Sequence, residues 1–84
     1  MSEGGAGAQA LHEAMSHLQK GELTAVAPAA FRALEAFTAA NDRTGAAAAH
    51  QVAAIGAVGL GLFDEALNHV DAGIALREST GDVE

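Results

Sequence analysis

Four histidines and the carboxylates beside them are the side chains of this chain that could bind a metal ion or transfer a proton. His12 and His17 are five positions apart, which is about 140° around an α-helix, so one metal ion could not easily bind both. Glu13 and His17 are four positions apart and share a helix face. A zinc ion needs about four convergent ligands, so this pair is only half of a site.

The remaining candidates for chemistry are dispersed. His50 and His69 lie on other segments, and nothing in their spacing brings them together, so we interpret all four histidines as surface or partly buried side chains with ordinary partners. The glycines around Gly59 and Gly61 mark a helix end and do not follow a strand, so they predict a turn and not a dinucleotide site. The carboxylates near the C-terminus predict a solvated face: Asp64, Glu65, Asp71, Glu78, Asp82 and Glu84.

The sequence contains no recognisable pair of nucleophile and base, phosphate-binding loop or metal cluster. We therefore expect no catalytic residues, no metal site and no cofactor, and we expect that the protein is not an enzyme.

Charge and composition restrict the partners. The 84 residues include 11 acidic and 4 basic side chains, with a formal net charge of −7, and such a chain repels phosphate backbones. Cysteine is absent, which agrees with a reducing compartment. The N-terminus has an acid where a signal peptide needs basic residues, and no apolar run is long enough to cross a bilayer. We expect a cytoplasmic protein without nucleic acid partners or membrane insertion.

Apolar periodicity and turn residues predict an all-α fold of four helices. The first covers about residues 8–20 and ends at Gly21. The second begins no earlier than about Leu23, with Thr24 as its N-cap and Pro28 in its first turn. The third covers about residues 45–60, and the fourth has Asp64 as a candidate cap and Gly81 as its stop.

The same periodicity predicts which side chains are buried. The third helix consists almost wholly of Ala, Val, Ile and Gly, so both of its faces should be covered. Its Gly56 and Gly59 lower helix propensity and predict close approach of another backbone or a partner. The predicted buried stripes of the second and fourth helices are Ala27, Phe31, Leu34 and Phe37, and Phe63, Ala66, Leu67, Val70 and Ile74.

A shift of 40 residues superimposes the chain on itself. Gly21 then falls on Gly61, Ala14 on Ala54 and Asp42 on Asp82, so the identities occur at turns and packing positions. Each unit consists of a helix, a glycine turn and a second helix. We predict a flexible N-terminal lead at residues 1–7, a first hairpin at 8–42 and a second hairpin at 43–84.

In the second unit the small residue Ala54 lies at a predicted helix contact, Gly61 precedes the turn and the aromatic Phe63 follows it. On these residues the unit resembles the tetratricopeptide repeat (TPR) family in its longer form of roughly 40 residues. The resemblance is weaker in the first unit, where Val26 replaces the usual Ala and Pro28 falls early in the second helix. An unrelated four-helix bundle is the structural alternative. The repeat-packing positions are Ala14, Gly21, Leu23, Ala54, Gly61, Phe63 and Ala66.

The resemblance implies a stack of hairpins whose concave wall, formed by the first helix of each hairpin, binds a partner. The implied wall is mostly apolar. It lacks the Lys, Arg and Asn with which chaperone-binding members of the family hold a carboxylate. The partner-binding residues carried over to this chain are Leu11, His12, Met15, Gln19, Gln51, Val52 and Ile55.

These features predict a non-catalytic module for protein–protein interaction. Stacked repeats usually need about three units for stability, and this sequence has two, so we expect self-association into a homo-oligomer or a filament-like assembly. The alternatives are an adaptor that binds an apolar peptide or helix of another protein in the concave groove, and a fragment of a larger TPR regulator.

Overall fold

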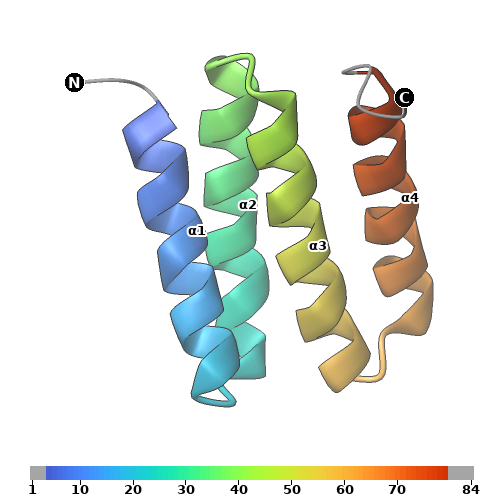
Figure 1. Ribbon diagram of the computed structural model, residues 1–84. Helices are drawn as coiled ribbons and strands as arrows, with labels where there is room; N and C mark the ends of the chain where they lie inside the picture. Colours follow the sequence, from blue (N-terminus) through green and yellow to red (C-terminus); the bar gives the residue numbers. More distant parts are fainter. Residues whose placement is uncertain (1–3, 80–84) are drawn as a thin grey trace.

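The computed structural model describes residues 4–79, and these form four α-helices and no strand: α1 (Gly4–Gln19), α2 (Leu23–Ala39), α3 (Arg43–Gly59) and α4 (Phe63–Ser79). Neighbouring helices run antiparallel in chain order from α1 to α4 (Figure 1). This confirms the predicted all-α fold of two antiparallel helical hairpins. The array is thin, with extents of 31 × 30 × 17 Å.

One turn geometry joins all four helices. Gly21, Asn41 and Gly61 have positive φ angles of 77°, 58° and 78° and are spaced every 20 residues. In each turn the residue after the positive-φ position donates a backbone hydrogen bond to a carbonyl five residues earlier, as from Glu22 to His17 at 2.9 Å and from Leu62 to Ala57 at 2.8 Å. This is the Schellman pattern, which glycine and asparagine favour because they tolerate positive φ.

The helix starts differ in part from the predictions. Asp42 caps α3, because its carboxylate accepts a hydrogen bond from the Gly45 N–H at 2.9 Å. Thr24 is not the cap of α2, since that helix begins at Leu23 and its N-cap is Glu22, without a side-chain hydrogen bond. Asp64 is not a cap either. It lies in the first turn of α4, where its charge suits the helix dipole.

Two further predictions on helix bounds need correction. Helix α1 begins at Gly4 and not near residue 8, because Gly7 is buried against the second helix and tertiary packing extends the helix towards the N-terminus. Pro28 lies beyond the first turn of α2. It faces solvent, so water can hydrogen-bond the Thr24 carbonyl that proline leaves without a helical donor. The predicted stop at Gly81 and the carboxylates Asp82 and Glu84 lie outside the described residues.

The core is built of small residues around one aromatic ring. Phe37 is 5% exposed, and its ring lies where Cβ atoms would be at Gly7 and Gly45, so α1 and α3 approach α2 closely only because both positions are glycine. Most of the other buried residues are alanine. Alanine allows the helix axes to come near one another. The dispersion energy of the core therefore comes from many close contacts between helices and less from large side chains.

The buried stripe of α2 is rotated from its predicted position. Phe31 is 58% exposed and Ala27 also faces solvent, whereas Phe37 is buried as predicted. The face that packs on α3 is mainly small, because small residues let α3 approach along the whole length of the helix. Its buried residues are Val26, Ala29, Ala30, Ala33 and Phe37.

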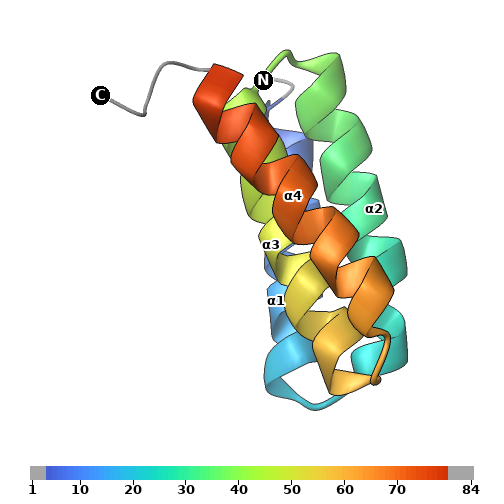
Figure 2. The ribbon, with the colours of Figure 1, turned by 90° about the vertical axis from the view of Figure 1, so that its right-hand side faces the viewer.

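The buried stripe predicted for α4 was also wrong, and here nearly all of the predicted residues are exposed. Phe63, expected to be buried at the turn, is 62% exposed, and Leu67 is 61% exposed. Ala66 is the one residue of the predicted stripe that is buried. Helix α4 packs mainly along α3 through its small face (Figure 2), and Leu76 of α4 also packs against the core cluster around Phe37 of α2.

Helix α3 lies between α2 and α4 and also contacts α1, so it is covered on more than one side. The prediction that both of its faces are covered was nevertheless wrong, because the face with Ile55 and Val58 is exposed. Gly56 and Gly59 are sites of close approach. A Cβ atom at Gly56 would lie 2.8 Å from Cγ1 of Val26, and one at Gly59 would lie 2.8 Å from Cδ1 of Leu23. The expected cost in helix propensity is therefore offset by close packing of α3 on α2.

Candidate interaction surface

A groove between α1 and α3 brings most of the predicted partner-binding residues together. Its volume is about 290 Å³, and its lining is mainly apolar. We call it the concave groove, and the predicted residues that line it are Leu11, Met15, Gln19, Gln51, Val52 and Ile55. His12 is exposed on α1 and does not line this groove.

A second groove lies between α3 and α4, and the sequence analysis did not predict it. Its volume is about 370 Å³. We call it the terminal groove. From α3 it is lined mainly by Gln51, Ala54, Ile55 and Val58. From α4 it is lined by His69, Val70, Gly73, Ile74 and Arg77.

The two grooves form one continuous surface, because Gln51 and Ile55 line both. Ile55 is 48% exposed at their junction. The side chain of Gln51 is held in place by Arg77, whose guanidinium donates a hydrogen bond to Oε1 at 3.1 Å. A partner could therefore contact α1, α3 and α4 at once.

Large apolar side chains extend the terminal groove along α4. Phe63, Leu67, Val70 and Ile74 recur at intervals of four, three and four residues, which places them on one stripe of the helix. Each of them is at least 44% exposed. Contiguous apolar surface of this kind is typical of interaction sites on small domains.

The predicted repeat-packing residues lie at the helix contacts and turns, with one exception. Ala14, Ala54 and Ala66 are buried, and Leu23 contacts Gly59. Gly21 and Gly61 occupy the positive-φ positions of the two hairpin turns. The exception is Phe63, which is exposed at the start of α4.

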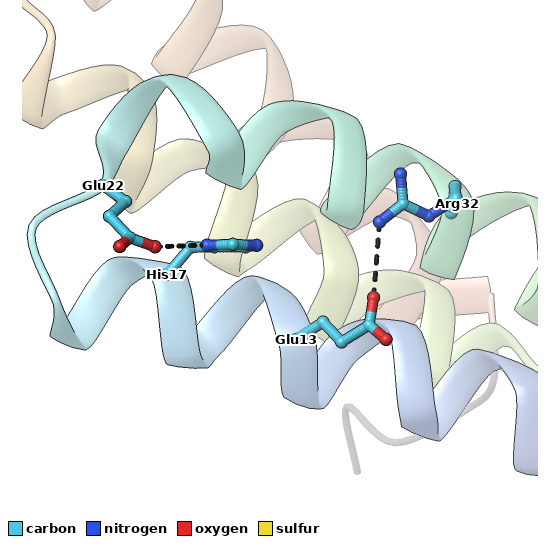
Figure 3. Close-up of polar contacts among 4 residues, drawn as sticks. All are labelled: Glu13, His17, Glu22 and Arg32. Atoms are coloured by element: carbon cyan, nitrogen blue, oxygen red, sulfur yellow. Dashed lines mark hydrogen bonds and ion pairs between the residues drawn. The ribbon is translucent and has the colours of Figure 1, made fainter.

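Figure 3 shows how the polar side chains of the first hairpin are paired. Glu13 on α1 accepts a hydrogen bond from Arg32 on α2 at 3.3 Å. His17 Nδ1 lies 2.6 Å from Oε1 of Glu22, and this hydrogen bond lowers the pKa of the Glu22 carboxyl below its ordinary value. Glu13 and His17, which could have formed half of a metal site, thus have separate partners.

The two histidines that the sequence left apart form a pair. Nδ1 of His50 on α3 lies 2.9 Å from Nδ1 of His69 on α4, and the ring centroids are 5.1 Å apart. The symmetry of a hairpin about its turn at Gly61 could have revealed this contact, because positions at similar distances from the turn face one another. No group of three or more possible metal ligands occurs among residues 4–79.

Burial lowers the pKa of the His50 imidazole, and the nearby charge of His69 lowers it further. Between the ordinary histidine pKa and this lowered pKa, unfolded chains therefore bind more protons than folded ones. The contribution of His50 to stability is complete above the ordinary pKa and is lost as the pH falls through the lowered one.

We expect the Tm of the chain to decrease as the pH is lowered from about 7.5 to about 5, because His50 is protonated more readily in the unfolded chain than in the folded one. The pH series should be measured by circular dichroism for the wild type and for His50→Phe. The variant should show the smaller decrease, since it keeps every other titrating group. Equal decreases in the two proteins would contradict a role for the histidine pair.

The described helices define an all-α protein of two antiparallel helical hairpins with an apolar surface across α1, α3 and α4. Comparisons of the chain with family models, curated proteins and solved structures found no match. Among the described residues, no helix combines the length and hydropathy needed to cross a bilayer.

Proposed function

We propose that this chain is a non-catalytic, TPR-like module for protein–protein interaction in the cytoplasm. The observation that carries the proposal is the exposed apolar stripe of α4, which is continuous with the terminal groove. Burying such a stripe against a partner is favourable by roughly 25 cal/mol per Å² of apolar surface.

Two kinds of partner fit this function. One is a second copy of the chain, which would make the protein a self-associating unit. The other is an apolar helix of a different protein, received in the concave or terminal groove. A net charge of −7 opposes association between copies, so self-association should strengthen as added salt screens the repulsion.

Ile55→Glu is the most informative variant for this proposal, because Ile55 lines both grooves and its side chain is half exposed. Light scattering over a dilution series at low and moderate salt reports self-association. Fluorescence anisotropy with two labelled helical peptides, one with an apolar face and one polar on all sides, reports binding of a helix.

We expect the wild type either to assemble or to bind the peptide with the apolar face. Ile55→Glu should weaken that association at least tenfold while leaving the helical circular dichroism spectrum unchanged, because a buried unpaired carboxylate is costly. Phe31→Glu is the control, since Phe31 is exposed on α2 and lines neither groove. A wild-type monomer that binds neither peptide would contradict the proposed function.

A further inference from the structure

The terminal groove repeats the surface on which α3 itself packs. Helix α3 covers small and apolar residues of the first hairpin, which consists of α1 and α2. A shift of 40 residues moves these positions onto the second hairpin. The covered positions of α1 are Leu11, Ala14 and Leu18, and they correspond to Gln51, Ala54 and Val58 of α3. The covered positions of α2 are Ala29, Ala30, Ala33 and Phe37, and they correspond to His69, Val70, Gly73 and Arg77 of α4. All seven of the shifted positions line the terminal groove.

The groove therefore has the shape of a site for one more helix, lying along α3 and α4 as α3 lies along α1 and α2. The face of α3 that fits the first hairpin contains Gly45, Gly56 and Gly59, each in close contact with a side chain of α2. A helix with a small apolar face can approach the terminal groove in the same way.

Helix α1 of a second copy lacks such a face. The positions of α1 that correspond to the inner face of α3 include Gln9, Glu13 and Ser16, and none of them is buried. Glu13 is also paired with Arg32 of α2. Stacking of a second copy head to tail would desolvate these polar groups against an apolar groove, which is unfavourable.

The charge beside the groove indicates a different occupant. Asp64, Asp71 and Glu78 are seven residues apart on α4 and are exposed, so they form a row along the edge of the apolar stripe that faces away from α3. The wall of the groove contains one basic residue, Arg77, which is hydrogen-bonded to Gln51 of α3. A helix in the groove would therefore have the carboxylate row along the edge that lies farther from α3.

We propose that the terminal groove binds a basic amphipathic helix of another protein, with small apolar residues against α3 and α4 and Lys or Arg over Asp64, Asp71 and Glu78. This inference rests on the proposed function and names the partner. Opposite charges at the rim add modest affinity and fix the orientation of the helix, while the apolar contact supplies most of the binding energy.

The internal repeat also gives the design of a probe peptide. Residue Asp71 corresponds to Phe31 of the first hairpin, and Phe31 shares a small pocket with His50 of α3. A peptide with the sequence of residues 43–59 should therefore place its positions 43, 50 and 57 over the carboxylate row. One labelled peptide carries Lys at these three positions and the matched peptide carries Glu.

We expect the wild-type chain to bind the Lys peptide at least tenfold more tightly than the Glu peptide at low salt, with a smaller ratio at high salt because the ion pairs are screened. Asp71→Lys should reduce this ratio several-fold. Glu35→Lys is the matched control, because it makes the same change in net charge at an exposed position of α2. Ile74→Glu should weaken binding of both peptides.

Four results would overturn the inference. Equal affinity for the two peptides, or equal effects of Asp71→Lys and Glu35→Lys, would show binding without a preference for a basic helix, while the proposed function would stand. Self-assembly that Ile74→Glu abolishes, without binding of either peptide, would identify a second copy as the occupant. A monomer that binds neither peptide would remove the proposed function as well. Circular dichroism of each variant confirms that it is folded.

Discussion

Phe37→Ala is expected to lower the free energy of unfolding by about 3–5 kcal/mol, the range for removing a buried aromatic ring. The ring is 5% exposed and is packed between Gly7 of α1 and Gly45 of α3. Neither glycine has a side chain that could move into the space left by the ring. For a chain of 84 residues the total stability is roughly 4–12 kcal/mol, so the variant should lose a large fraction of its stability.

Urea denaturation followed by circular dichroism measures this effect. Phe31→Ala and Phe63→Ala are the matched controls, because these rings are 58% and 62% exposed. Each control should change the free energy of unfolding by less than about 1 kcal/mol. A Phe37→Ala variant as stable as the two controls would contradict the placement of this ring at the contact of α1, α2 and α3.

Gly56→Ala and Gly73→Ala are expected to change stability in opposite directions. A Cβ atom at Gly56 would lie 2.8 Å from Cγ1 of Val26, which is 1% exposed and branched at Cβ, so neither side can yield without strain. At Gly73 the nearest atom is the Ala47 carbonyl oxygen at 3.6 Å, an ordinary contact. Alanine should therefore cost about 1–3 kcal/mol at Gly56 and contribute about 1 kcal/mol at Gly73.

Thermal and urea unfolding of the two variants beside the wild type tests this difference. Gly56→Leu should be still less stable than Gly56→Ala, although leucine is a good helix former. If Gly56→Ala were as stable as Gly73→Ala, helix propensity alone would govern both sites, and the close contact between α2 and α3 would not be present in solution.

The number of helices and their turns could be predicted from the sequence because glycine and asparagine tolerate the positive φ angles that the turns require. Gly21 and Gly61 predict turns without any knowledge of packing. The start of α1 could not be predicted in this way, since helix formation before residue 8 depends on the contact between Gly7 and a ring 30 positions away in the sequence.

The buried faces were harder to predict, because α2 and α4 each have two apolar faces. One face carries large side chains such as Phe31 and Leu67, and the other is small. Hydrophobicity favours burial of the large face, whereas close helix packing favours the small one, and in this fold the small face is buried. The resemblance to stacked repeats predicted the residues of the concave groove. The terminal groove could not be predicted in this way, because it is recognised only when the residues that α3 covers in the first hairpin are known and are shifted by 40 positions.

The position of α4 at the edge of a thin array has a consequence for folding cooperativity. Helices α1, α2 and α3 are all in mutual contact, whereas α4 packs along α3 and buries only Ala66 fully. Detaching α4 therefore breaks one helix contact and leaves the other three helices paired, so it costs less free energy than global unfolding. We therefore expect α4 to open before the other helices, and a partner that covers its apolar stripe to join it to the cooperative core.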